Sequence, residues 1–219
     1  MTINDYFCNW IKVIDIDELN SVLSKIKRMN LNTLCPQYKN IFRAFEECSY
    51  DNLKCVFLGQ DPYPQKGVAT GLLFGNDIHR WEQASPSLKV VLRAIGEEIP
   101  DDFDYSLKHW ANQGILMINS SLTCELNKPG SHSLIWRPFI SSLLHNISIS
   151  NRAIVFVLFG NQAQSFRGSI YPRGNFILED KHPAYYARLN ANMGNDVFVK
   201  TRTLLKDYWN YDLDYINSK

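Results

Sequence analysis

Four short runs of apolar and β-branched residues divide the chain, at residues 54–58, 115–118, 153–159 and 175–178. Runs of this length are typical of strands buried on both faces, as in a parallel sheet. Stretches with helical spacing of apolar residues lie before and between them, at residues 16–29, 37–45, 136–147, 161–166 and 198–208. Another helix is predicted to start at Ser85-Pro86, with Ser85 as N-cap and Pro86 at the first helical position. Strands that alternate with helices predict an α/β fold with a mostly parallel sheet.

The chain has 219 residues, enough for one sizeable core and too few for two comfortable ones. It contains no internal repeat, low-complexity stretch or linker-like segment, so we expect one domain over residues 1–219. The predicted architecture is a three-layer α/β/α domain around a central four-stranded sheet. The formal net charge of +1 does not mark the chain as a nucleic-acid binder. A local basic face is still compatible with it, because phosphate contacts need only a few well-placed donors.

The five cysteines argue against several classes of site. They are odd in number, scattered, and contain no Cys-x-x-Cys pair, which speaks against a disulfide framework and against a zinc or iron–sulfur centre: Cys8, Cys35, Cys48, Cys55 and Cys124. We therefore expect no metal and no cofactor. The sequence shows no run of signal-peptide or membrane-span type, so an intracellular, cytoplasmic and soluble protein is expected.

Polar side chains follow each predicted strand at the point where it ends. The four segments are Gly59-Gln60-Asp61, Asn119-Ser120-Ser121, Gly160-Asn161-Gln162 and Lys181-His182-Pro183. In a parallel sheet these ends meet at one edge, which is where such folds bind ligands. Turn and N-cap chemistry is the alternative explanation, and it accounts for Asn161 at least as well. For Asp61 and His182, each beside a proline, the pattern favours a functional role.

These segments, taken in order, resemble family 1 uracil-DNA glycosylases. The resemblance rests on Gly59-Gln60-Asp61-Pro62-Tyr63 with Gly71-Leu72-Leu73-Phe74 after it, Ile115-Leu116-Met117-Ile118-Asn119 with Leu122-Thr123, Ser131-His132 with Trp136, Gly160-Asn161-Gln162-Ala163-Gln164, and His182-Pro183. It extends from about Trp10 to Leu205. A lone Asp-Pro-Tyr would carry little weight, whereas five ordered motifs at consistent spacing are a specific signal.

The resemblance implies an enzyme that flips uracil out of DNA and hydrolyses its N-glycosidic bond, initiating base-excision repair. Asp61 and His182 are the implied catalytic residues. The carboxylate would orient a water and stabilise an oxocarbenium ion, and a neutral imidazole would donate a hydrogen bond to uracil O2. The implied partners are single- or double-stranded DNA that contains uracil and a proteinaceous glycosylase inhibitor. The enzyme is expected to be a monomer that needs no metal.

Four residues are the implied uracil-binding set. Asn119 offers a donor and an acceptor that complement uracil O4 and N3–H. Phe74 would stack on the base, and Tyr63 would occupy the space that the C5 methyl of thymine needs. Gln60 would position the base. From the sequence alone, core packing explains Phe74 and Tyr63 about equally well.

The expected DNA-binding residues are those near the remaining motifs: Ser87, Asn161, Tyr185, Tyr186 and Arg188. Here the chain departs from the family pattern. Pro64 replaces the usual histidine, and some viral members share this proline. Ala184 and Ala187 stand where serines pinch the DNA backbone. Tyr186 replaces the leucine that fills the gap left by the flipped base.

A fourth departure is Asn161, which replaces a serine after Gly160. Together the changes affect the residues that grip DNA and leave the base pocket intact, so weaker duplex binding is expected. His132 matches a family position near the DNA, but a lone histidine is more often structural, and it is not counted as catalytic.

Two other functions remain open at this point. One is a non-catalytic or weakly catalytic DNA-binding or polymerase-associated protein that kept the glycosylase fold. Retention of Asp61, Asn119 and His182 together argues against it. The other is a glycosylase for a different damaged base. Such relatives usually lack either the carboxylate or the tyrosine of the first motif, and this chain has both.

Overall fold

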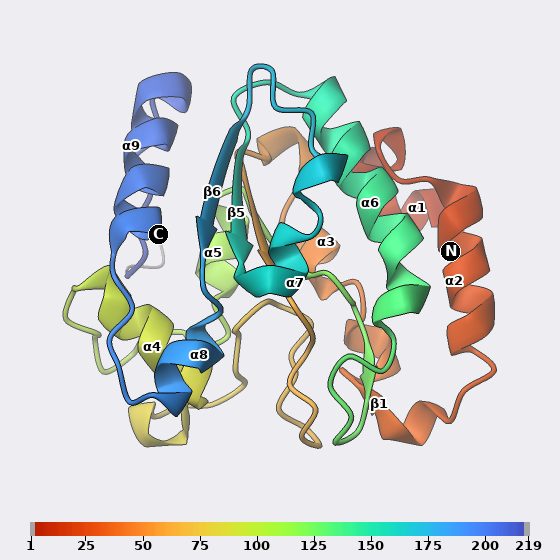
Figure 1. The fold of residues 1–219 in the computed structure, drawn as a ribbon, viewed down its shortest axis with the longest axis horizontal. Helices are drawn as coiled ribbons and strands as arrows, with labels where there is room; N and C mark the ends of the chain where they lie inside the picture. The colour runs from red at the N-terminus through yellow and green to blue at the C-terminus, as the bar shows by residue number, and fades with distance from the viewer. Residues whose placement is uncertain (1–2, 217–219) are drawn as a thin grey trace.

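The computed structural model describes residues 3–216 and has a four-stranded sheet at its centre (Figure 1). The strands are β2 (Cys55–Gly59), β3 (Ile115–Asn119), β5 (Val155–Phe159) and β6 (Phe176–Asp180). Their order is β3-β2-β5-β6, and all neighbours are parallel. The predicted α/β fold is therefore confirmed, with each strand within two residues of its predicted limits.

Helices cover both faces of this sheet and give the predicted three layers (Figure 1). On one side lie α4 (Pro86–Ile95) and α9 (Asp196–Trp209), and on the other lie α6 (Ser133–Ser150) and α2 (Ile16–Ile26). All residues of β2, β3 and β5 are buried, which explains why their sequences are apolar without alternation. β6 lies at the edge and is only half-buried.

Several helix predictions hold, with shifted ends. Ser85 caps α4 by accepting a hydrogen bond from the Leu88 N–H at 3.3 Å, and Pro86 is the first helical residue. α4 ends at Gly96, which has a φ of 75°. α6 and α9 are longer than predicted, whereas α2 ends three residues earlier, at Ile26. α7 (Gly160–Gln164) is a single short helix of five residues.

The predicted helix at residues 37–45 is wrong. The segment forms a 3₁₀ turn, Tyr38–Asn40, followed by the separate helix α3 (Arg43–Glu47). The two pieces meet at Phe42, whose φ of −107° and ψ of 14° lie outside the helical range. Gly71 packs on this corner, since a Cβ there would lie 2.0 Å from the Asn40 carbonyl oxygen. The apolar positions of the segment nevertheless face the core, since Ile41, Ala44 and Phe45 are all buried.

The sequence pattern missed five short elements. They are α1 (Ile3–Phe7), α5 (Lys108–Asn112), α8 (Pro183–Arg188) and an antiparallel pair of β1 (Leu34–Cys35) with β4 (Cys124–Glu125). Each is too short to show a hydrophobic period. α8 matters most, because it begins directly after His182 and contacts α4.

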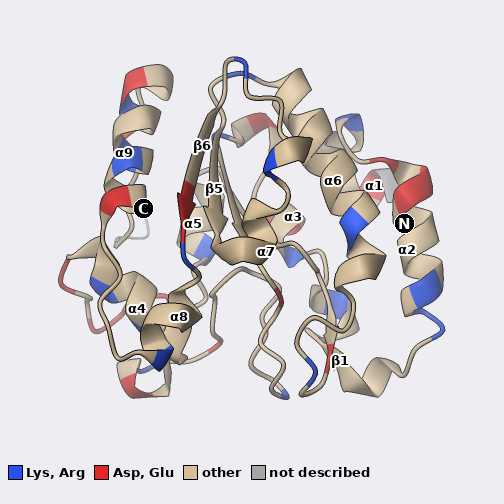
Figure 2. Cartoon of the chain, in the orientation of Figure 1, with Lys and Arg blue, Asp and Glu red and all other residues tan. Residues whose placement is uncertain are grey.

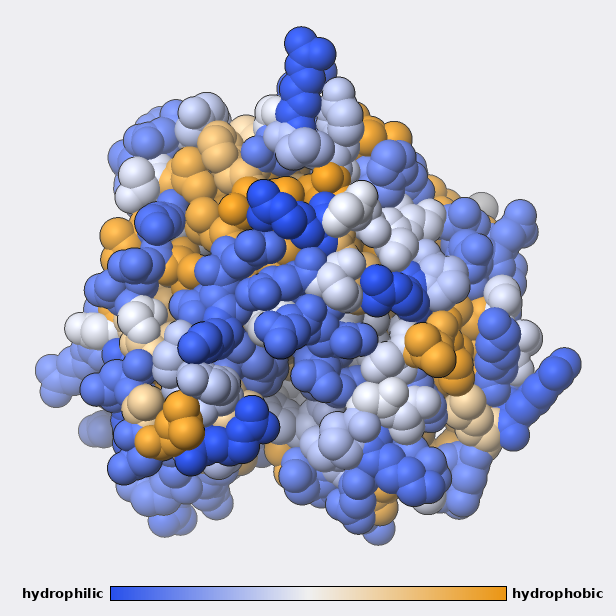
Figure 3. Space-filling view, viewed as in Figure 1, coloured by the Kyte–Doolittle hydropathy of each residue, from blue (hydrophilic) through white to orange (hydrophobic). Residues whose placement is uncertain are grey.

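The surface is largely hydrophilic, with an apolar area over β6 and α9 (Figure 3). No helix within residues 3–216 is long and apolar enough to span a membrane. The prediction of one domain covers residues 1–219, of which residues 1–2 and 217–219 lie outside the described part.

Candidate active site

Five of the predicted site residues line one pocket at the carboxyl edge of the sheet. Asp61 and Tyr63 follow β2, Asn119 ends β3, and His182 follows β6, while Phe74 comes from the loop after β2. Apolar side chains complete the wall, namely Ile41, Pro62, Leu72, Leu73 and Leu122. The parallel register, which pairs Gly59 with Asn119, brings these strand ends together.

Asn119 presents an unpaired acceptor to this pocket. Its side chain is 7% exposed, and its Oδ1 atom is buried without a hydrogen-bond partner among the described residues. Gly59 makes room for it, because a Cβ there would lie 2.8 Å from Asn119 Oδ1 and 2.2 Å from Leu73 Cδ1. An unmet buried acceptor costs about 1–3 kcal/mol, so a ligand with an N–H at this point would be favoured.

Asp61 places a second unsatisfied group beside the first. Both carboxylate oxygens are buried, and neither makes a hydrogen bond of good geometry within residues 3–216. Burial raises the pKa of Asp61 above its ordinary value, and the nearby Gln60 amide and Gly130 N–H offset only part of this effect. The carboxylate is thus free to bind a water or to face a positive charge.

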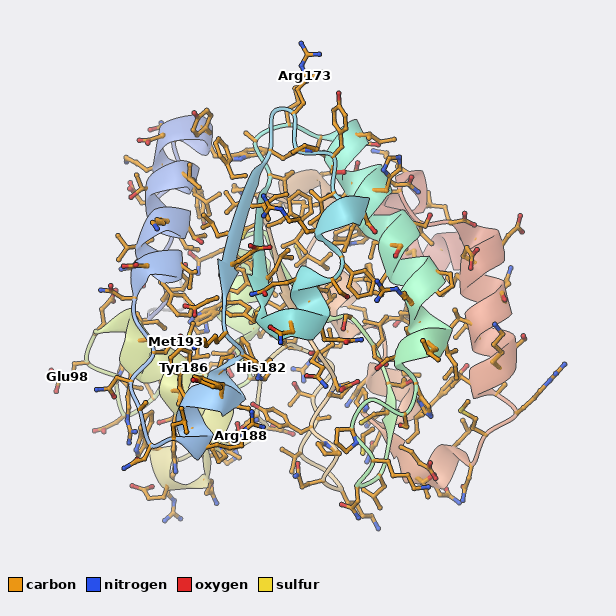
Figure 4. All side chains as sticks on the ribbon, viewed as in Figure 1. Glu98, Arg173, His182, Tyr186, Arg188 and Met193 are labelled. Carbon is orange, nitrogen blue, oxygen red and sulfur yellow. The ribbon has the colours of Figure 1, made fainter. Side chains whose placement is uncertain are left out.

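His182 is held as a neutral donor. The Ala184 N–H donates to His182 Nδ1 at 3.1 Å, so the ring proton of the neutral form lies on Nε2. Burial, together with the positive charge of Arg188, lowers the pKa of His182 to about 4. Figure 4 shows His182 and Arg188 close together, at the start and the end of α8. At neutral pH the side chain therefore lines the pocket as an uncharged imidazole.

The close approach of Gly160 fixes the position of the His182 backbone. Gly160 has a φ of 85°, and a Cβ there would lie 2.8 Å from His182 Cβ. The glycine after β5 is therefore needed for packing against the strand end that carries His182. Its neighbour Asn161 is exposed and lines neither this pocket nor the adjacent groove, so the structure does not bring it to the pocket.

Phe74 has an unusual backbone conformation, with a φ of 63°. Its ring is 4% exposed and packs edge-on against Phe159 and His182, with ring centroids 5.3 Å and 5.7 Å apart. The left-handed region costs an aromatic residue about 1–2 kcal/mol, and such strain is concentrated at ligand sites. Phe74 is thus both a core residue and a pocket wall, which unites the two roles that the sequence left open.

Gln60 lies at the rim. Its side chain is exposed and approaches Asp61, while its backbone carbonyl accepts hydrogen bonds from Ser120 Oγ and Ser121 N, both at 3.0 Å. The structure therefore places Gln60 beside Asp61 and outside the pocket lining.

A wide groove adjoins the pocket and includes two of the predicted DNA-binding residues, Ser87 and Arg188. Ser87 at the start of α4 lines it together with Ala184, Ala187 and Arg188 of α8, and the two helices are in contact. The shared wall between pocket and groove is Tyr63. Figure 2 shows basic and acidic residues interspersed along this lower edge of the molecule. Binding of DNA there would therefore depend on individual contacts to phosphates.

The two tyrosines of α8 differ in their freedom. Tyr185 is 37% exposed, and the Lys181 ammonium lies 4.3 Å from its ring centroid. Tyr186 is half-buried against the core, and its hydroxyl donates to Asp180 Oδ1 at 2.8 Å. Tyr186 is therefore tethered to the end of β6 in this conformation (Figure 4).

The sequence pattern missed one connection in this site. Ser85, predicted only as a helix cap, also donates from Oγ to the Tyr63 hydroxyl at 2.6 Å. Nothing in the local sequence signals it, because Tyr63 and Ser85 lie 22 residues apart. His132, which was left out of the catalytic set, is buried with Nδ1 2.9 Å from Thr123 Oγ1, away from the pocket lining. No group of three or more metal-ligating side chains occurs in the described part of the chain.

Comparison with known proteins identifies the family. The family model of the Uracil DNA glycosylase superfamily matches residues 45–211, a span that includes every predicted site residue. The chain belongs to this superfamily. Curated relatives named uracil-DNA glycosylase include one from Amoebophilus asiaticus, 36% identical over 81% of this chain and 81% of its own length. Another, from Borreliella burgdorferi, is 37% identical over 79% of this chain and 78% of its own length.

Solved structures of glycosylases share the fold. A mimivirus UNG variant crystallised in complex with UGI superposes with a TM-score of 0.73 at 22% identity, covering 87% of this chain and 78% of that one. The UNG of Nitratifractor salsuginis gives a TM-score of 0.58 at 19% identity, covering 93% and 89%. Both comparisons support the fold of this glycosylase.

Proposed function

We propose that this chain acts on uracil in DNA and hydrolyses the N-glycosidic bond after the nucleotide has rotated out of the helix, through Asp61, His182 and Asn119. Its relatives at 36% and 37% identity are named uracil-DNA glycosylase, and uracil excision for DNA repair follows from that kinship. The observation that carries the assignment of residues is the pocket itself. Asp61 and Asn119, with their unpaired oxygens, and the neutral His182 all line this one pocket.

Recognition begins with the buried acceptor. Asn119 Oδ1 would accept the N3–H of uracil, and the amide nitrogen would donate to O4. Cytosine has no hydrogen on N3, so its binding would leave Oδ1 unpaired at a cost of about 1–3 kcal/mol. The Phe74 ring would lie against the base, and Tyr63 would exclude the methyl group of thymine.

Cleavage follows from the Asp61 carboxylate and the neutral His182 ring, which line the same pocket. When the bond between C1′ and N1 breaks, its electron pair leaves with uracil, and negative charge gathers at O2. The Nε2–H of His182 would donate to that oxygen, because its Nδ1 already accepts from Ala184. The Asp61 carboxylate would stabilise the oxocarbenium ion and orient the water that adds to C1′. The proton of that water would pass to Asp61 and finally restore neutral uracil.

The altered DNA-gripping residues refine the proposed substrate. Ala184 and Ala187 lack the hydroxyls that could donate to phosphate, and Ser87, which lines the same groove, retains one. We therefore propose weaker binding of duplex DNA with the chemistry retained, in a divergent member that carries Pro64. An inhibitor protein is a further proposed partner, supported by the mimivirus UNG crystallised with UGI. The alternative of a non-catalytic DNA-binding protein is not favoured, since Asp61, Asn119 and His182 all line the pocket.

Base specificity tests the pocket assignment directly. Asn119→Asp should admit cytosine, because a protonated or rotated carboxyl can complement its exocyclic amine. Tyr63→Ala should permit slow release of thymine. Both are measured as strand cleavage by alkali after incubation with oligonucleotides that contain a single uracil, cytosine or thymine. If both variants fold and neither releases its new base, Asn119 and Tyr63 do not select the base as proposed.

A further inference from the structure

The hydroxyl of Tyr63 is held from two sides. Ser85 Oγ donates to it at 2.6 Å, and the hydroxyl in turn donates to the Phe74 carbonyl at 3.3 Å. Each hydroxyl has one hydrogen, so these two bonds use both. The phenol therefore has no hydrogen left for a base or for DNA, and its position is set by the protein.

Ser85 is itself fixed by two further hydrogen bonds. Its Oγ accepts from the Leu88 N–H at 3.3 Å as the N-cap of α4. Its backbone N–H donates to Asn76 Oδ1 at 2.7 Å, and Asn76 is only 2% exposed. The chain of bonds from Leu88 through Ser85 and Tyr63 to Phe74 runs in one direction, an arrangement in which each bond strengthens the next.

The Tyr63 ring needs such an anchor because of where it stands. It lines both the uracil pocket and the groove beside Ser87, and so divides the two spaces. Its backbone lies in an irregular loop between Pro62 and Pro64, with no strand or helix to hold it. Without the Ser85 bond the ring can turn toward the groove, which leaves room in the pocket for a methyl group.

We propose that Ser85 is a specificity-determining residue that keeps thymine out of the pocket by pinning Tyr63. The role is one of positioning, because Ser85 lies outside the pocket lining. It rests on the proposed function, in which Tyr63 excludes the C5 methyl. It adds the residue on which that exclusion depends and links it to the first turn of α4, which also carries Ser87.

The test compares uracil and thymine release by Ser85→Ala and Tyr63→Phe on single-stranded oligonucleotides. One neutral hydrogen bond is worth about 1 kcal/mol, so the ratio of uracil to thymine kcat/KM should fall about fivefold or more in each variant. The double variant should show no loss beyond that of Tyr63→Phe, because that variant already lacks the bond to Ser85. Ser85→Thr keeps a hydroxyl and should retain the wild-type ratio.

Asp15→Ala is the control variant for the general effect of losing a helix cap. Asp15 Oδ1 caps α2 by accepting from the N–H groups of Asp17 and Glu18, both at 3.1 Å, on the opposite side of the sheet. This variant should lower thermal stability by a similar amount and leave the ratio at its wild-type value. A ratio that also falls in Asp15→Ala, or that stays unchanged in Ser85→Ala, would overturn the role of Ser85. If the wild-type chain released no uracil, the proposed function would fall first.

Discussion

The backbone N–H of Ala184 reaches Nδ1 of His182 at 3.1 Å, and this one contact decides which nitrogen faces the substrate. A histidine that accepts on Nδ1 carries its proton on Nε2 as long as it is neutral. His182 is also the N-cap of α8, so helix capping and the proposed catalytic role use the two nitrogens of one ring.

The protonation of His182 should follow from this contact and from burial. Because its pKa is lowered to about 4, the ring should stay neutral at pH 6, where an exposed histidine is largely charged. Nitrogen NMR of the labelled protein, with the His182 signal assigned by its absence from His182→Asn, should show that His182 keeps a protonated Nε2 and an unprotonated Nδ1 down to about pH 5. A ring that titrates near pH 6.5 would contradict the proposed neutral donor.

Stability should respond to pH with a definite sign. The unfolded state takes up the His182 proton near pH 6.5 and the folded state only near pH 4, so the folded state loses stability as pH falls through this window. His182→Asn keeps an N-cap acceptor but has no proton to bind. Its Tm should therefore fall less than that of the wild type between pH 7 and pH 5, as followed by thermal unfolding. Equal losses of Tm in the wild type and in His182→Asn would mean that other groups cause the acid sensitivity.

Tyr186 should act as a wedge that must first be released. Its hydroxyl is bound to Asp180 at 2.8 Å, and breaking this bond to reach DNA costs about 1 kcal/mol. Tyr186→Phe keeps the stacking ring and removes the tether, so excision from duplex DNA should rise about fivefold or less. Tyr186→Ala should impair duplex excision much more than single-strand excision, where no stack must be broken.

Tyr185 provides the matched control for this experiment. It is exposed, and its hydroxyl accepts a hydrogen bond from the Lys181 ammonium at 3.3 Å. One residue of slippage in this loop would make it the wedge. Should Tyr185→Ala alone reduce duplex excision while both Tyr186 variants behave like the wild type, the wedge is Tyr185. Equal losses on both substrates for all variants would mean that α8 only packs against the fold.

Serine at positions 184 and 187 should restore duplex grip. Both alanines line the groove together with Ser87, and a hydroxyl there could donate to a phosphate. Ala184→Ser with Ala187→Ser should tighten duplex binding several-fold, about 1 kcal/mol for one new hydrogen bond. Binding is measured by fluorescence anisotropy with a duplex that carries a non-cleavable uracil nucleotide. An unchanged Kd at the same salt concentration would show that the groove does not hold the backbone.

The fold was predictable because the strands of a buried parallel sheet have no polar face. β2, β3 and β5 are buried at every position, and their apolar runs stand out from the polar strand ends. The same reasoning found Asp61, Asn119 and His182, since chemistry at a parallel edge must follow directly after a strand. It failed at residues 37–45, where the apolar spacing is helical but the backbone leaves the helical conformation at Phe42.

Other features of the site depend on contacts that no local pattern records. The bond from Ser85 to Tyr63 joins loops that meet only in the folded chain. The tether of Tyr186 to Asp180 depends on α8, a helix of six residues that is too short to show a period. The strained backbone of Phe74 is likewise a tertiary effect, because nothing around an aromatic residue marks a left-handed conformation.

Uracil release by the wild type and by Asp61→Asn, side by side on one single-stranded oligonucleotide, tests the account most directly. The substitution keeps the shape of Asp61 and removes a charge that burial already disfavours, so Tm should stay at or above the wild-type value. Electrostatic stabilisation of this kind is worth about 3–4 kcal/mol. We expect ready excision by the wild type and a loss of at least about a hundredfold in the folded variant. Near-full activity of Asp61→Asn, or no uracil release by the wild type, would contradict the proposed mechanism.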